Sequence, residues 1–230
     1  GDGKADYAIW RPSDTPGVAD FYILNSGDFT IRGYSHGLTT DIPVAGDFDG
    51  DGKNDIVVFR PSTGTWYLWE TTTQTTRSAQ FGSPGDIPMA MDNDGDGKAN
   101  LAVYRPSDRY WYIARATGVP AQNFDSIQWG LPTDILGPGD YDGDGKADVA
   151  VFRPSDGVWY VLRSSNNGVS YTQFGASGDV PVPGDYDGDG KTDVAVYRNG
   201  VWYINGSTSG FSAQTFGLPT DKPIPAAYHP

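Results

Sequence analysis

The chain has 230 residues and a formal net charge of −13 at pH 7, from 29 acidic and 16 basic residues. So much negative charge argues against nucleic acid and anionic membrane surfaces as partners, because both would repel it. Cysteine is absent, which excludes a disulfide framework and thiol chemistry.

The composition also predicts an all-β protein with one domain. Glu70 is the only glutamate, and aspartate, which makes up the rest of the acidic residues, favours turns over helices. With 31 glycines and 17 prolines, few long helices can form. No apolar run is long enough to span a membrane and no signal-like segment opens the chain, so we expect no membrane insertion. The opening Gly-Asp-Gly-Lys is that expected of a mature or excised piece.

The chain begins with the back half of an aspartate-rich motif, and the first complete copy is residues 47–55. That copy, Asp-Phe-Asp-Gly-Asp-Gly-Lys-Asn-Asp, has carboxylates at positions 1, 3, 5 and 9. Four negative charges so close together repel one another, and a hard cation would relieve the repulsion. Calcium fits best because it accepts six to eight oxygen ligands in flexible geometry, whereas magnesium requires a tight octahedron.

Three more complete copies follow, and in each the predicted ligands are the side chains at positions 1, 3, 5 and 9 and the carbonyl of the lysine at position 7. Asn100 replaces the fourth aspartate of the second copy and should weaken it, while Asp2 and Asp6 alone are not expected to hold an ion. An EF-hand is excluded because position 12 of the first copy is Val58, inside a predicted strand. The position-9 aspartates could bind through both oxygens. The predicted ligands are Asp47, Asp49, Asp51, Lys53 and Asp55; Asp92, Asp94, Asp96, Lys98 and Asn100; Asp140, Asp142, Asp144, Lys146 and Asp148; and Asp185, Asp187, Asp189, Lys191 and Asp193.

Each repeat unit contains four predicted short strands. After the loop come an apolar run that ends in arginine, an aromatic strand, a segment that ends in an aromatic residue or histidine before glycine, and an extended piece with proline. The lysines of successive loops lie 45 to 49 residues apart, a period typical of solenoids, propellers and arrays. Four short strands per unit is the content of a propeller blade.

The sequence therefore predicts an all-β fold, a five-bladed β-propeller of four-stranded blades. Residues 222–230 align with the fourth segment of the other units, whereas the N-terminal unit lacks that segment. We therefore expect the C-terminal strand to pair with the N-terminal blade and close the ring. The predicted blades are residues 1–37 with 222–230, 38–82, 83–130, 131–175 and 176–221.

The recurring order Phe-Gly, Gly-Asp-Ile-Pro and Asp-x-Asp-x-Asp-Gly-x-x-Asp resembles the FG-GAP (VCBS) repeats of integrin α-subunit propellers, bacterial surface proteins and some fungal lectins. The resemblance covers essentially the whole chain. It implies a calcium-binding β-propeller with an adhesive or ligand-binding role. Integrin-like propellers have seven blades with longer units, so this chain departs from them in blade number.

Two repeated side-chain types allow two interpretations each. One arginine and one aspartate per unit could form internal ion pairs, or the arginines could bind anions around a channel; they are Arg11, Arg60, Arg105, Arg153 and Arg198, and Asp41, Asp86, Asp134, Asp179 and Asp221. The tryptophans could stack on sugar rings, or they could pack between adjacent blades and hold them together. The candidate sugar-binding residues are Trp66, Trp111, Trp159 and Trp202, each followed by a tyrosine that points to the opposite face, into the core.

These features predict a secreted or cell-surface binding module with three to four structural calcium ions, since such loops fill best where calcium is near millimolar. We expect no enzyme, because the sequence has no cysteine nucleophile, histidine cluster, phosphate loop or paired carboxylates outside the repeat. Repeated aromatic sites favour multivalent carbohydrate binding through avidity. The alternative is an adhesion or scaffolding module for an extracellular protein, or a non-catalytic domain of a larger secreted protein. Asn205 begins a single glycosylation sequon.

Overall fold

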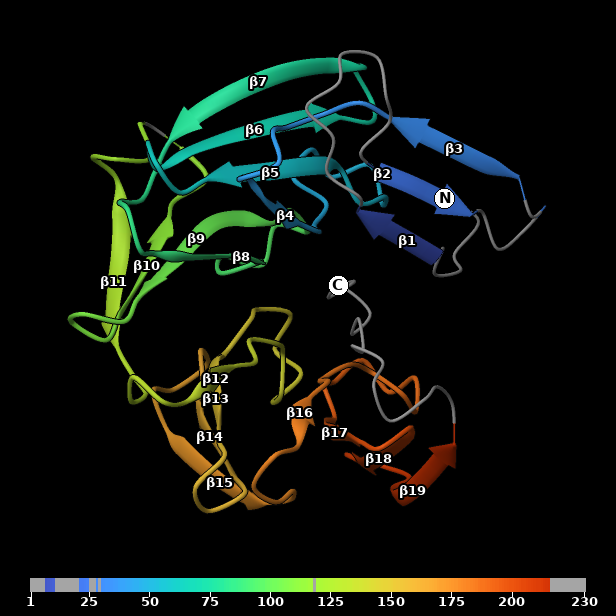
Figure 1. Ribbon diagram of the computed structural model, residues 1–230. Coiled ribbons are helices and arrows are strands. Elements are labelled where there is room, and N and C mark those ends of the chain that lie inside the picture. Colours follow the sequence, from blue (N-terminus) through green and yellow to red (C-terminus); the bar gives the residue numbers. More distant parts are fainter. Residues whose placement is uncertain (1–6, 11–20, 25–27, 29, 118, 216–230) are drawn as a thin grey trace.

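The computed structural model describes residues 7–10, 21–24, 28, 30–117 and 119–215, and within these ranges every regular element is a β-strand (Figure 1). The strands form five antiparallel sheets of consecutive strands. One sheet has three strands, β1 (Tyr7–Trp10), β2 (Phe21–Leu24) and β3 (Ile31–Tyr34). None of the described residues forms a helix with the length and hydrophobicity of a membrane span.

The other four sheets have four strands each. The first contains β4 (Ile42–Val44), β5 (Ile56–Arg60), β6 (Thr65–Glu70) and β7 (Thr75–Gln80). The second contains β8 (Ile87–Met91), β9 (Asn100–Arg105), β10 (Tyr110–Ala114) and β11 (Phe124–Gln128). The third contains β12 (Ile135–Leu136), β13 (Val149–Arg153), β14 (Val158–Leu162) and β15 (Val169–Gln173). The fourth contains β16 (Val180–Pro181), β17 (Val194–Arg198), β18 (Val201–Gly206) and β19 (Gly210–Thr215).

The sheets are arranged around a central axis as the blades of a β-propeller (Figure 1). Strands β4, β8, β12 and β16 lie nearest to the axis, and β7, β11, β15 and β19 lie at the periphery. The sequence predicted five four-stranded blades; the described residues contain four of them, together with the three-stranded sheet β1–β3. The strand predicted to complete that sheet and close the ring, within residues 222–230, lies outside the described residues. We refer to the four-stranded blades by their predicted numbers, two to five.

The second strand of each four-stranded blade forms the core. Strands β5, β9, β13 and β17 each contain at least four consecutive buried residues. Both faces of such a strand pack against other blades, which explains why its sequence is a continuous apolar run rather than an alternation. Phe59 of β5, for example, shares a core cluster with Val103 of β9 in the next blade. The outer strands alternate or are exposed throughout, because they face solvent.

Three of the four repeated tryptophans of the third strands belong to this core, which contradicts the prediction that they bind sugar. Trp66, Trp111 and Trp159 are 0% exposed, so none offers a ring face to a ligand. Each indole N–H donates to the carbonyl of the residue before the repeated glycine, over 2.7 Å from Trp66 to Phe81 and 3.0 Å from Trp159 to Phe174. Trp202 is partly buried and packs edge-on against Tyr186 and Tyr197. The tryptophans therefore act as wedges between blades.

Candidate metal centres

The four aspartate loops connect the first and second strands of their blades and lie at one end of the propeller. Neighbouring loops are joined by short backbone hydrogen bonds of 2.6 Å from position 8 of one loop to the position-1 carbonyl of the preceding loop. The three bonds run from Ala99 to Asp47, from Ala147 to Asp92 and from Thr192 to Asp140. The loops therefore form one continuous chain of contacts around the central axis.

Within each loop the position-1 carboxylate organises the turn. Asp47 accepts hydrogen bonds from the backbone N–H groups of Gly50 at 2.6 Å and Gly52 at 2.7 Å. Both glycines have left-handed φ angles, +81° and +80°, which residues with a Cβ rarely adopt. The same pair of bonds recurs on Asp92, Asp140 and Asp185. The glycines at positions 4 and 6 are thus required by the backbone conformation.

Three carboxylates converge in every loop, with oxygen atoms within 4.8 Å of one another. In three loops the cluster consists of positions 1, 3 and 9: Asp47, Asp49 and Asp55; Asp140, Asp142 and Asp148; and Asp185, Asp187 and Asp193. In the second loop it consists of positions 1, 3 and 5, which are Asp92, Asp94 and Asp96. The structure therefore brings together three of the predicted ligands in each loop, and in the second loop position 5 takes the place of position 9.

The position-9 carboxylates are buried and costly to ionise. Asp148 is 0% exposed, and burial, reinforced by the charge of Asp142, raises its pKa to about 6. Burial likewise raises the pKa of Asp55 to about 6, with Asp49 and Asp47 adding repulsion. Two backbone N–H groups donate to each carboxylate and offset part of this cost of burial. Phe48 and Thr71 donate to Asp55, both at 2.9 Å. A cation among these groups would favour their charged form.

A second observation tests whether the loops fit a hard cation. One carboxylate oxygen, Oδ1, of both Asp142 and Asp187 is buried and has no hydrogen-bond partner. An anionic oxygen removed from water without a partner is strongly unfavourable unless an ion supplies the missing interaction. Both residues belong to the carboxylate clusters, and every donor there is oxygen, the ligand type of hard cations. The residues present fit such an ion.

Three of the four aspartate loops also have partners that the sequence interpretation missed, in the turn after the third strand. Thr71 donates its backbone N–H to Asp55 and its hydroxyl to Asp51 at 2.9 Å. Ser164 does the same to Asp148 and Asp144, and Ser207 to Asp193 and Asp189. The signal was available, because each of these hydroxyl residues lies five positions after the repeated tryptophan. The turn therefore holds the carboxylates at positions 5 and 9 in place.

The predicted ion pairs lie at the other end of the blades. Arg60 bonds Asp41 through two parallel contacts of 2.9 Å, and equivalent two-point pairs join Arg105 to Asp86, Arg153 to Asp134 and Arg198 to Asp179. Each guanidinium also lies over the tyrosine that follows the tryptophan, at 4.0 to 5.2 Å from the ring centre. The prediction of internal ion pairs is confirmed for these four, and Arg11 and Asp221 lie outside the described residues.

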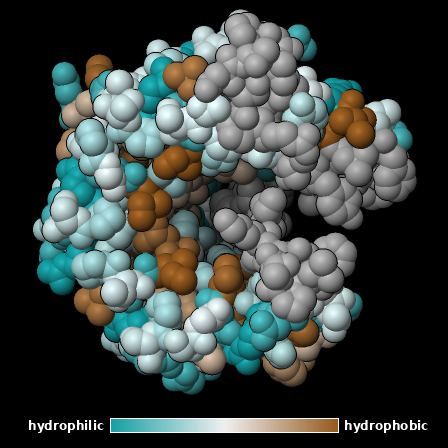
Figure 2. Space-filling view, viewed as in Figure 1, coloured by the Kyte–Doolittle hydropathy of each residue, from teal (hydrophilic) through white to brown (hydrophobic). Residues whose placement is uncertain are grey.

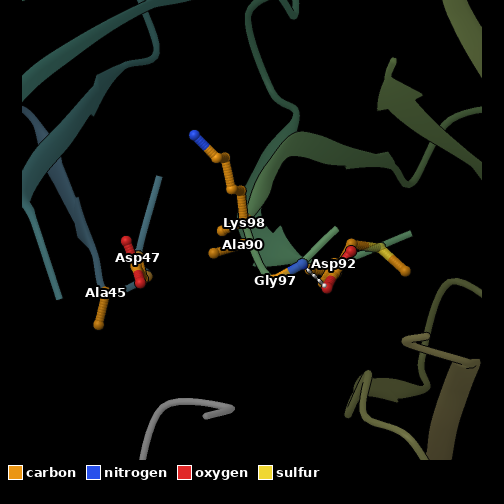
Figure 3. Close-up of a pocket in the computed structure, with 9 residues that line it drawn as sticks. Ala45, Asp47, Ala90, Asp92, Gly97 and Lys98 are labelled. Carbon is orange, nitrogen blue, oxygen red and sulfur yellow. Dashed lines mark hydrogen bonds between the residues drawn. The ribbon is translucent and has the colours of Figure 1, made fainter. Parts of the chain in front are cut away.

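A small recess separates the first two loops (Figure 3). Asp47 and Asp92, the position-1 residues of adjacent loops, lie on either side of Ala90 and Lys98. Lys98 Nζ donates to the carbonyl of Asp49 over 2.8 Å, so its side chain crosses to the preceding loop. The recess offers about 20 Å³, which is room for a water molecule and not for an organic ligand.

The fold and these loops define the class of the protein, a β-propeller in which each of the four described four-stranded blades carries an aspartate loop between its first two strands. The family model for the FG-GAP-like repeat matches residues 47–103 and 140–196. The chain thus contains FG-GAP-like repeats, and the resemblance seen in the sequence is confirmed. Comparison with curated protein sequences found no match.

Several solved structures share the fold. Virginiamycin B lyase from Staphylococcus aureus has a TM-score of 0.54 at 7% identity, covering 86% of this chain and 64% of that one. An Agrocybe aegerita lectin that recognises non-reducing terminal N-acetylglucosamine has a TM-score of 0.53 at 15% identity, covering 86% and 60%. BBS1N, solved in complex with ARL6DN, has a TM-score of 0.50 at 12% identity, covering 88% and 63%. The chain spans less than two thirds of each, and identities this low show the fold alone.

Proposed function

We propose that the protein is a calcium-stabilised binding module that acts outside the cell and engages a protein ligand without catalysing a reaction. The proposal has two parts, which rest on opposite ends of the propeller. The aspartate loops at one end support calcium. The surface around the channel at the other end supports ligand binding.

Calcium is supported by the charge and chemistry of the loops. The four loops contain 15 aspartates and 4 lysines, so they carry −11 of the net charge of −13. Their carboxylates form clusters, and two of these contain buried oxygens without a partner. Bound calcium would be structural, because the ligands come from within each loop and, in three of the loops, the neighbouring turn hydrogen-bonds two of them. Millimolar calcium, as found outside cells, would keep sites of this kind filled.

A ring of exposed aliphatic side chains carries the binding proposal. The first residue of every innermost strand is aliphatic and 38 to 45% exposed; this apolar ring consists of Ile42, Ile87, Ile135 and Val180. Leu38 and Leu131 extend it, each donating its backbone N–H to the paired aspartate of its blade. Figure 2 shows hydrophobic side chains gathered around the central hollow. Exposed apolar side chains that recur at the same place in successive blades mark a candidate interaction site.

Charge favours the same end for a protein ligand. Outside the loops the chain has a formal charge of only −2, and the arginines near the apolar ring are neutralised by their aspartates. An apolar centre surrounded by compensated polar groups is the usual composition of a protein interface. Three of the repeated tryptophans, Trp66, Trp111 and Trp159, would have favoured sugar but are in the core.

The test is a binding screen against a panel of extracellular protein domains, followed by variants of the ring. Ile87→Asp combined with Ile135→Asp places charge in the ring, and Val169→Asp places the same charge on the outer strand β15, where Val169 is also exposed. We expect each captured domain to lose about tenfold or more in affinity with the ring variant and none with the control. Binding that survives the ring variant would refute the proposed surface. Unchanged melting temperatures will show that both variants are folded.

Carbohydrate binding is the second candidate, because two aromatic side chains on outer strands are more than half exposed. Tyr171 of β15 and Phe211 of β19 are each 67% exposed. Aromatic faces of this kind can stack on sugar rings, and a copy in each of several blades would give avidity. A glycan array, run with and without calcium, tests this directly. Glycan binding that is lost in Tyr171→Ala with Phe211→Ala, and kept in the ring variant, would replace the protein ligand with a carbohydrate.

A further inference from the structure

The loop of blade three, residues 92–100, differs from the other three loops at two contacting places. In the other blades, the turn after the third strand donates one backbone N–H to position 9 and one hydroxyl to position 5. Ser164 illustrates this, with 2.7 Å to Asp148 and 2.9 Å to Asp144. In blade three, position 9 is Asn100, and the residue five positions after the tryptophan is Ala116.

Both changes remove hydrogen bonds between the turn after the third strand and the aspartate loop. Asn100 keeps its carbonyl oxygen for the N–H of Asn93, at 2.8 Å, as Asp148 does for Tyr141. Its other polar atom is an amide nitrogen, which is a donor and cannot accept from the backbone N–H of residue 116. Ala116 has no hydroxyl for Asp96. Among the described residues, no hydrogen bond joins residues 115–117 to this loop.

The carboxylate cluster changes accordingly. Asp148 and Asp193 anchor their clusters with a buried carboxylate, whereas the blade-three cluster replaces position 9 by Asp96 and exposes two of its three members. A loop with one charge fewer, and with two of its three clustered carboxylates exposed and not held by the neighbouring turn, holds calcium less tightly, because affinity follows the number of charged ligands and the rigidity of the site.

We propose that loop 92–100 is the labile calcium site of the protein, which exchanges calcium while the other three loops stay loaded, and that residues 100 and 116 set this difference together. The inference rests on the proposed calcium binding. Residue 116 is a positioning residue, because a hydroxyl at this place would reach the ion only through Asp96. The affinity difference should be about tenfold or more, the effect expected of one carboxylate ligand in an oxygen-ligand site.

Calcium titration of the metal-free protein by calorimetry, with bound ions counted by native mass spectrometry, tests the number and affinity of the sites. We expect three tight ions and one weak ion. Asn100→Asp with Ala116→Ser should convert the weak site into a fourth tight one, with each single change giving less. The reverse change, Asp148→Asn with Ser164→Ala, should leave two tight and two weak sites.

Amide hydrogen exchange locates the weak site independently of stoichiometry. Gly95 and Gly97 donate to Asp92 just as Gly143 and Gly145 donate to Asp140, at 2.6 to 2.9 Å. At a calcium level that fills only the tight sites, the two amides of blade three should exchange faster than their counterparts in blade four. Four equal sites, or a double variant that leaves the weak site weak, would overturn this inference alone. No bound calcium in any variant would overturn it together with the proposed calcium binding.

Discussion

Acidification should stabilise the calcium-free protein and destabilise the calcium-loaded one. In the metal-free fold, burial raises the pKa of Asp55 and Asp148 from 3.8 to about 6. The folded state therefore takes up protons near pH 6 that the unfolded chain does not yet bind, so metal-free stability rises as pH falls through the folded pKa. Calcium requires the charged carboxylates, so its affinity falls over the same range.

The magnitude follows from the two pKa values. Between pH 7.5 and 5.5, a carboxyl with a folded pKa of about 6 gains about 0.8 kcal/mol of stability, so the two together give about 1.6 kcal/mol. For a domain of this size that corresponds to a rise in melting temperature of about 3 to 6 °C. Asp189 does not contribute between pH 7.5 and 5.5, because its hydrogen bonds with Ser207 and Thr208 lower its pKa to about 2 and keep it ionised over this range.

The assay is a melting curve in chelator and in saturating calcium at each pH. The matched control is Asp55→Asn with Asp148→Asn, since Asn100 shows that an asparagine at position 9 can keep the bond to the position-2 N–H. In chelator the control should lose most of the rise. The metal-free wild-type protein should melt at a higher temperature at pH 5.5 than at pH 7.5. If its melting temperature falls or stays level, the two buried carboxylates do not have raised pKa values in the folded state.

Calcium removal at pH 7.5 should lower the melting temperature substantially, and elemental analysis should find three to four calcium ions per chain; equal melting with and without chelator contradicts a structural role. Asp134→Asn, which breaks the two-point pair with Arg153, should cost about 2 to 4 kcal/mol in urea unfolding, whereas Asp125→Asn in the exposed pair with Arg115 should cost less than about 1. Trp159→Ala should cost about 3 to 5 kcal/mol in the same assay, and a smaller loss would mean that the indole is not a wedge.

The strand pattern and the aspartate loops could be predicted because each is encoded locally. Alternation along the third strands showed that Trp159 and Tyr160 face opposite ways, but it could not show which face is internal, because blades pack on both faces. The structure settles this through long-range contacts: the Trp159 N–H reaches Phe174, and Arg153 lies over Tyr160. The hydroxyl residue at Ser164 recurs at a fixed place after the tryptophan, but the repeat alone could not show that it bonds Asp144, which lies 20 residues earlier in the sequence. The predicted fifth four-stranded blade depends on residues outside the described ranges.

The two ends of the innermost strands separate stability from binding. β4 begins at the exposed Ile42 and is followed directly by the loop that starts at Asp47, and the same order recurs at β8, β12 and β16. Calcium bound at the loop end would therefore have no contact with a ligand on the apolar ring. It can influence that ligand only by keeping the blades folded. Ligand affinity should thus stay constant as calcium is withdrawn until the protein begins to unfold, whereas a ligand held by the ion itself would lose affinity in step with ion occupancy.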